Sequence, residues 1–182
     1  MLEDHPFGLF PNYEELLGGV SGIKVLRVNL RFTKWNGAKA ENSFGRKPII
    51  DYGGKPEFAE IAIKNVATEG GWSARWIQTY GSGKNGPFFF SIWIDGPLKE
   101  QIPDPIESGH HQLLLKKISS LNGNSYKGCW DTLCWCNQKT LFIELKRHNK
   151  DRIRDTQIKW LEASLKAGLD LDNFPIAEWD FR

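Results

Sequence analysis

Residues 128–161 read GCWDTLCWCNQKTLFIELKRHNKDRIRDTQIKWL, and this stretch carries the strongest pattern in the chain. Asp131 stands at the start of one apolar, strand-like run, and Glu144 and Lys146 stand two residues apart at the end of the next. Side chains alternate along a strand, so Glu144 and Lys146 project to the same face. A basic loop and a helix with Gln157 in its first turn follow. The pattern predicts an α/β domain in which these four side chains share one site.

The flanking sequence supplies further elements of both kinds. Alternation of apolar and polar residues over 24–33 is typical of a half-buried strand. Pro56 suits the first turn of a helix, which Gly70-Gly71 would end. Asp155 is a residue type that caps helix N-termini, here for a helix running to Ala167. The remaining expectations are a helical turn at 13–17, strands at 48–52, 72–80, 87–94, 130–136, 141–146 and 176–181, and a helix at 108–121.

Residues 81–86, GSGKNG, match the pattern GxGxxG but do not indicate a dinucleotide site. That fingerprint has to open a helix, because the helix N-terminus holds the pyrophosphate. Here the strand-like run 87–94 follows instead. A hairpin turn is the better interpretation.

Composition indicates one folded domain. The chain has 182 residues, of which 40% are hydrophobic and 13% aromatic, enough for a core and too many for a disordered chain. No apolar run is long enough to span a bilayer, and the N-terminus lacks the basic start and apolar centre of a signal peptide. We therefore expect a cytoplasmic protein with no membrane partner. Cys129, Cys134 and Cys136 form an odd-numbered cluster, which favours free thiols over disulfides or a zinc site.

Basic residues gather between residues 139 and 166. This segment holds eight Lys or Arg and only four Asp or Glu, although the whole chain has a net charge of +2. A basic surface there would attract a polyanion, whereas the simpler interpretation is a solvated loop and helix face. The candidates for contacts with backbone phosphates are Arg147, Lys150, Arg152, Arg154 and Lys159.

Asp131 and Glu144 together suggest a metal site. If their strands form a hairpin, the carboxylates could share a divalent cation, with Mg²⁺ or Mn²⁺ preferred over zinc because the ligands are oxygens. Such an ion polarises a phosphoryl oxygen and activates water, and Lys146 would stabilise the developing negative charge. Taken singly, each residue is an ordinary turn, ion-pair or surface residue. Their order and spacing together favour a nuclease.

The segment resembles the PD-(D/E)XK nuclease superfamily, and most closely its VRR-NUC branch of virus-type replication and repair nucleases. The branch has a glycine three residues before the aspartate, as Gly128 stands to Asp131, and an apolar run into Glu-x-Lys. It then has a basic loop and a helix that begins Asp-x-Gln-x-x-Trp-Leu, as residues 155–161 do. Trp130 replaces the usual proline before the aspartate, and the Pro103-Asp104 pair lies in a Pro-rich loop far from Glu-x-Lys.

The resemblance implies a restriction-endonuclease-like fold, a mixed sheet flanked by helices. The core would cover 56–182 of a single domain 1–182, with an inserted hairpin and helix at about 81–127 and an N-terminal β extension at 1–55. The family core also has an N-terminal helix with an acid that faces the site. Glu60 is the candidate for that acid, and Glu57 is the second choice.

The resemblance also implies roles for the central residues. In such enzymes the aspartate and the glutamate bind the metal, as Asp131 and Glu144 would here, and the backbone carbonyl of Leu145 would be a further ligand. Lys146 would assist catalysis, and Gln157 would lie at the active site.

We therefore expect a Mg²⁺- or Mn²⁺-dependent nuclease that acts on DNA. No base-reading module is evident, so cleavage would be structure-selective or independent of sequence, in DNA repair, replication or phage-related processing. A homodimer would let one small domain cut both strands. The alternatives are a nuclease directed at RNA and a non-catalytic nucleic-acid-binding or interaction protein that keeps the fold.

Overall fold

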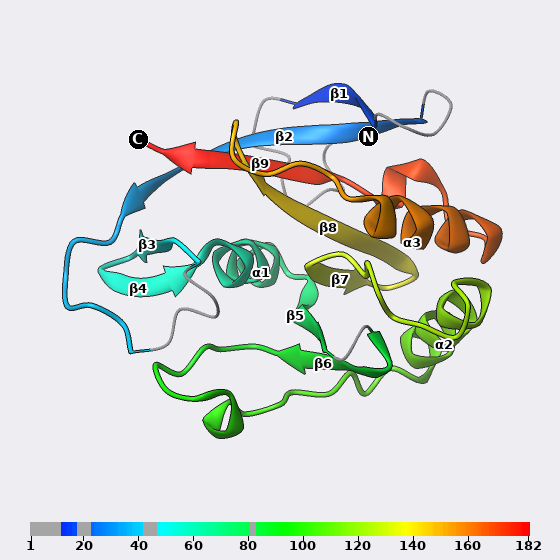
Figure 1. Ribbon diagram of the computed structural model, residues 1–182, viewed down its shortest axis with the longest axis horizontal. Coiled ribbons are helices and arrows are strands. Elements are labelled where there is room, and N and C mark those ends of the chain that lie inside the picture. Colours follow the sequence, from blue (N-terminus) through cyan, green and yellow to red (C-terminus); the bar gives the residue numbers. More distant parts are fainter. Residues whose placement is uncertain (1–11, 18–22, 42–46, 81–82) are drawn as a thin grey trace.

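The computed structural model describes residues 12–17, 23–41, 47–80 and 83–182 (Figure 1). Within these ranges the α-helices are α1 (Ala59–Glu69), α2 (Gly109–Leu121) and α3 (Asp155–Lys166), and the 3-10 helices are η2 (Leu98–Glu100) and η3 (Leu171–Asn173). The strands are β1 (Asn12–Leu17), β2 (Ile23–Lys34), β3 (Ile49–Tyr52), β4 (Lys55–Phe58), β5 (Ser73–Tyr80), β6 (Asn85–Phe90), β7 (Thr132–Cys136), β8 (Lys139–Arg147) and β9 (Ile176–Phe181).

The strands of the described ranges form one mixed sheet in the order β4-β3-β2-β9-β8-β7-β5-β6, with β1 added to β2. β9 runs parallel to both β2 and β8, and the other pairs are antiparallel. β8 lies inside the sheet, and its interior residues 140–146 are all buried. A strand with parallel pairing and covered faces has to be apolar on both sides, which explains the continuous run Leu141–Ile143.

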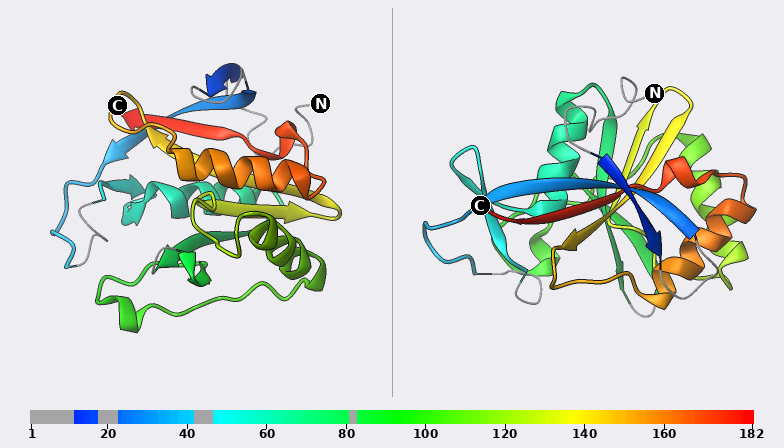
Figure 2. Two further views of the ribbon diagram at one scale, coloured as in Figure 1. Left: turned by 45° about the vertical axis from the view of Figure 1, so that its right-hand side comes forward. Right: turned by 90° about the horizontal axis from the view of Figure 1, so that it is seen from above.

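Helices cover both faces of the sheet. In the right-hand view of Figure 2, α1 and α3 lie on opposite sides of β2 and β9. Ile143 of β8 packs with α1 in one core, whereas Phe142 packs with α2 and α3 in the other. Because side chains alternate, Glu144 and Lys146 project on the same side as Phe142, toward α3. An α/β domain with a mixed sheet flanked by helices is therefore confirmed.

Four local expectations are wrong. The strand expected at 87–94 stops early, because β6 ends at Phe90. Residues 13–17 belong to strand β1 and not to a helical turn. Pro56 lies in β4, so α1 begins only at Ala59. β4 is an edge strand, where a proline without an N–H is tolerated. The N-cap of α3 is Arg154, one residue before the predicted Asp155.

Other expectations are confirmed. β5 and β6 form the predicted antiparallel hairpin around 81–86, although residues 81–82 themselves lie outside the described ranges. β9 and α2 have the predicted extents, and the three cysteines are free thiols.

None of the described helices is long and apolar enough to cross a membrane.

The sheet opens beside the start of β7. The pairing of β5 with β7 ends where Trp76 lies opposite Thr132, and the pairing of β8 with β7 ends where Ile143 lies opposite Thr132. Beyond this point β5 continues against β6, and β8 continues against β9. Residues that precede β7 or end β5 and β8 therefore meet around one gap.

Candidate active site

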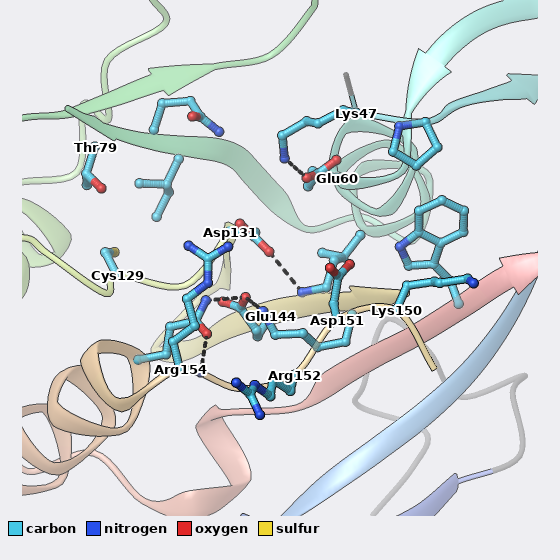
Figure 3. A pocket seen from close by; sticks show the side chains of 17 residues that line it. Lys47, Glu60, Thr79, Cys129, Asp131, Glu144, Lys150, Asp151, Arg152 and Arg154 are labelled. Atoms are coloured by element: carbon cyan, nitrogen blue, oxygen red, sulfur yellow. Dashed lines mark hydrogen bonds and ion pairs between the residues drawn. The ribbon is translucent and has the colours of Figure 1, made fainter. Parts of the chain in front are cut away.

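A pocket of about 790 Å³ lies at this gap and is lined mainly by polar and charged residues (Figure 3). It brings together all six residues that the sequence predicts for catalysis or metal binding. These are Glu60, Asp131, Glu144, Leu145, Lys146 and Gln157.

Asp131 is fixed by the strands on either side of it. Its backbone carbonyl accepts a hydrogen bond from Ile77 N of β5 (2.7 Å), and its Oδ2 accepts one from Leu145 N of β8 (3.0 Å). The Asp131 carboxylate thus accepts a hydrogen bond from the β8 backbone just beyond the point where the pairing of β7 with β8 ends. The N–H and C=O of one strand residue point to the same side, so the Leu145 carbonyl is directed toward the same gap.

Glu144 is buried, and its two carboxylate oxygens have different surroundings. Oε1 accepts hydrogen bonds from Lys146 Nζ (2.6 Å) and Gln157 Nε2 (2.5 Å). Oε2 is also buried but has no hydrogen-bond partner in the part of the chain that the structure describes. Leaving a buried carboxylate oxygen unpaired is costly, so Oε2 is the atom at which a bound cation or donor would be stabilised.

The charges of Asp131 and Glu144 also favour a bound cation. Burial raises the pKa of Glu144 well above its ordinary value, and the charge of Asp131 raises it further. Lys146 acts in the opposite direction. Two neighbouring carboxylates can share a proton or a cation, because the negative charge of one disfavours ionisation of the other. The Asp131–Glu144 pair is therefore arranged to hold positive charge.

Gln157 ties the first turn of α3 to these carboxylates. Its Oε1 accepts a hydrogen bond from Arg154 N (3.0 Å), while its Nε2 donates to Glu144 Oε1. The bond to Arg154 is the glutamine half of a capping box, and the arginine side chain has no acceptor to supply the other half. One side chain thus stabilises the helix start and holds Glu144.

The turn before Asp131 lies against the same helix end. Gly128 has a φ of +85°, and a Cβ at this position would lie 1.9 Å from Thr156 O and 2.9 Å from Gln157 N. Only glycine permits both that backbone conformation and that approach. Trp130 is fully buried and donates from Nε1 to Gln157 O (3.3 Å). Trp130 therefore supports the first turn of α3 beside the site.

Of the two candidate helical acids, Glu60 is the one at the pocket. Glu60 lies in the first turn of α1 and pairs with Lys47 (Figure 3). Glu57 lies in β4, outside the pocket lining, and its Oε1 accepts a hydrogen bond from Phe58 N (3.2 Å). Burial raises the pKa of Glu57 to about 7.

The five basic candidates separate into two groups. Arg147 turns away from the pocket, and its Nε donates to Asp180 Oδ1 (3.3 Å) at the end of β9. Lys159 is exposed on α3 and is not part of the lining. The other three, from the loop between β8 and α3, line the pocket: Lys150, Arg152 and Arg154 (Figure 3).

Several lining residues had no signal in the sequence. Lys47 and Pro48 precede β3, Gln78 and Thr79 end β5, and Trp179 belongs to β9. They lie far from residues 128–161 along the chain, and only the order of strands in the sheet brings them to the pocket. A basic residue before a proline, as in Lys47-Pro48, is too common to indicate a site by itself.

The donor set at the pocket consists of oxygens. Within the described ranges, no three His, Cys, Asp or Glu side chains gather closely enough to hold a metal ion by themselves. Asp131 and Glu144 offer two carboxylates, and the Leu145 carbonyl offers a third oxygen. Mg²⁺ keeps several waters and is usually held by one or two carboxylates together with substrate phosphates. The residues fit an ion of that kind and do not fit a closed zinc site.

Comparison with known proteins found no matching protein-family model, no significantly similar curated protein and no significantly similar solved structure.

Proposed function

We propose that this protein is a metal-dependent nuclease that hydrolyses phosphodiester bonds of DNA. The observation that carries the proposal is the meeting of Asp131, Glu144 and Lys146 at one pocket, with Glu144 Oε2 buried and unpaired among the described residues. A structural ion pair has no need of a second carboxylate beside it. Buried polar groups are almost always hydrogen-bonded, so an unpaired buried carboxylate oxygen favours a ligand site.

Asp131 and Glu144, with the Leu145 carbonyl, are the groups that would hold Mg²⁺ or Mn²⁺. Such an ion, when bound, supplies a Lewis acid for the phosphoryl oxygen and lowers the pKa of water. Burial first and the charge of Asp131 second raise the pKa of Glu144, and a cation beside the pair would take the place of the proton and relieve the repulsion between the two carboxylates.

The remaining residues act directly on the substrate or on the carboxylates. Lys146 is held 2.6 Å from Glu144 Oε1 and would stabilise negative charge that develops on the phosphate. Gln157 engages the same Oε1, which leaves Oε2 for the ligand. Exposed side chains beside the pocket would contact neighbouring phosphates and give affinity without a choice of base, namely Lys150, Arg152 and Arg154.

The arrangement of the elements supports the finer assignment to a restriction-endonuclease-like fold of the PD-(D/E)XK superfamily. That resemblance implies a mixed sheet with helices on both faces and an acid on an N-terminal helix. The corresponding features are α1 and α3 on opposite faces, with Glu60 at the pocket. β1 to β3 would then be the N-terminal extension, and β6 and α2 the insertion.

Cleavage assays with matched variants test the proposal. The full chain is incubated with Mg²⁺ or Mn²⁺ and with single-stranded, duplex and branched DNA, and with RNA. We expect cleavage of DNA that EDTA abolishes, and a loss of about 10²- to 10³-fold in Lys146→Met, the magnitude typical of removing one group that stabilises transition-state charge. Asp131→Asn should be inactive. Lys116→Met, an exposed residue of α2, is the matched control and should cleave like wild type.

Each other outcome overturns part of the proposal. Cleavage of RNA but not of DNA would mean that RNA is the substrate. Binding of nucleic acid without cleavage would indicate a non-catalytic binding protein. Equal cleavage by wild type and Asp131→Asn would show that the activity arises elsewhere or from a contaminant.

A further inference from the structure

Lys47 lies outside the segment that carries the nuclease-like pattern, yet it lines the same pocket (Figure 3). Its ammonium group forms an ion pair with Glu60 Oε1. The Lys47 side chain is 29% exposed and lines the pocket, so part of it faces the space that a ligand would occupy. An ammonium group has three donors, and one bond to Glu60 leaves others for that ligand.

The local fold holds Lys47 in this place. β3 begins at Ile49, which pairs with Phe58, the last residue of β4, and α1 begins at the next residue. The β3–β4 hairpin therefore keeps Lys47 beside the first turn of α1, where Glu60 lies. A hydrogen bond from Trp35 N to Ile49 O (3.2 Å) fixes the same segment from the other side.

Three carboxylates act on the Lys47 ammonium. Burial by itself lowers the pKa of Lys47, but Glu60, Asp131 and Glu144 outweigh that effect and raise the pKa above its ordinary value. Lys47 therefore stays charged. The same three acids would repel an entering phosphodiester, and a lysine among them reduces that repulsion. Lys146 is placed in the same way against Glu144, so the pocket holds two acid–lysine pairs.

We propose that Lys47 binds a backbone phosphate of the nucleic acid in this pocket, and that Glu60 positions Lys47 instead of binding metal. This inference rests on the proposed nuclease function, whose substrate supplies the phosphate. Glu60 is an acid already neutralised by an ammonium group, which makes it a weaker ligand for a second cation than Asp131 or Glu144. The N-terminal part of the chain thus contributes a substrate contact to the site.

The salt dependence of binding tests the role of Lys47. Fluorescence anisotropy with labelled single-stranded DNA is measured in EDTA at several NaCl concentrations. Loss of one phosphate contact lowers the slope of log K against log salt by about 0.7, which is about a fivefold weaker affinity at 0.1 M salt. Lys47→Met should show both changes, Lys47→Arg should keep the wild-type slope, and Lys116→Met is the matched control. An unchanged slope and affinity in Lys47→Met overturns the assignment.

A double-mutant comparison tests the role of Glu60. If Glu60 positions Lys47, Glu60→Gln weakens DNA binding in the wild-type background and has no effect in Lys47→Met. Tighter binding by Glu60→Gln in both backgrounds would mean that Glu60 only repels DNA, which overturns the positioning role.

Thermal unfolding with Mn²⁺ gives a readout that does not depend on activity. Lys47→Met and Glu60→Gln should keep the rise in Tm that Mn²⁺ causes in wild type, whereas Asp131→Asn should lose it. Loss of that rise in Glu60→Gln would make Glu60 a metal ligand and overturn the inference. Unfolding curves without Mn²⁺ show whether each variant is folded, and Lys47→Gln replaces Lys47→Met if the latter is not.

Failure of this inference and failure of the proposed function are distinguishable. If the wild-type protein neither binds nor cleaves nucleic acid, both the nuclease function and the role of Lys47 are wrong. If the wild-type protein cleaves DNA through Asp131 and Lys146 but Lys47→Met binds DNA like wild type, only the role of Lys47 is wrong.

Discussion

Replacing Gly128 by alanine tests whether the turn before Asp131 sets the position of Gln157. An alanine Cβ would lie 1.9 Å from Thr156 O, and such contacts essentially never fall below 3.0 Å in proteins. The turn and the start of α3 would therefore have to separate by about 1.1 Å. Because Gln157 is the third residue of α3, that movement would carry its Nε2 away from Glu144.

Two costs contribute to the expected loss of stability. The backbone of Gly128 has a φ of +85°, and an L-residue in the left-handed region costs about 1–2 kcal/mol. Relief of the collision with Thr156 adds about 1–3 kcal/mol, as for other overpacked sites. We expect Gly128→Ala to lose about 2–5 kcal/mol in the free energy of unfolding. If the proposed function holds, cleavage should fall about 10²-fold, since a 1 Å misplacement in an active site has an effect of that size.

Gly71→Ala is the matched control for this experiment. Gly71 has a φ of +84°, but a Cβ at this position would meet nothing within 4 Å. The control therefore carries the backbone cost alone, about 1–2 kcal/mol, and should keep wild-type cleavage. Urea denaturation and cleavage rates are measured for both variants. Equal destabilisation of the two, with unchanged cleavage by Gly128→Ala, would show that the approach of residue 128 to Thr156 does not set the position of Gln157.

Two further predictions concern Gln157 and Glu57. Gln157→Met should lower the free energy of unfolding, measured by urea denaturation, by about 1 kcal/mol, the usual effect of losing a capping bond. Gln157→Glu keeps the acceptor for Arg154 N but places a carboxylate against Glu144, so this variant should stay folded and lose cleavage. Normal cleavage by Gln157→Glu would contradict this role. Burial raises the pKa of Glu57 to about 7 from an ordinary 4.5, so the unfolded chain releases this proton at lower pH than the folded protein. The contribution of Glu57 to the free energy of unfolding is therefore complete below pH 4.5 and is lost as pH rises toward 7. In urea denaturation, Glu57→Gln should be more stable than wild type at pH 8 but not at pH 4. A constant difference between the two proteins across this range would show that Glu57 does not titrate as described.

Strand and helix patterns were readable where one periodicity prevailed. The run at 24–33 alternates, those at 141–146 and 176–181 are mostly apolar, and all three are strands. The helix around 108–121 is also where the sequence places it. Errors arose where pairing with another strand overrides local preference. Residues 13–17 become strand β1 because β2 offers them a partner, and Pro56 is accepted in β4 because that strand lies at the edge of the sheet.

Local sequence patterns identify the side chains that can take part in chemistry. Asp131, Glu144, Lys146 and Gln157 are identifiable because a two-residue strand period and a helix start place them on predictable faces, and these are local properties of the chain. Which other residues join them at the pocket depends on the tertiary structure. Glu60, and not Glu57, lines the pocket because α1 begins after β4, and Arg147 lies against Asp180 instead of the pocket. The tertiary structure also brings Lys47 to the pocket through the β3–β4 hairpin, which pairs Ile49 with Phe58. Such contacts join residues far apart in the chain, and no local periodicity encodes them.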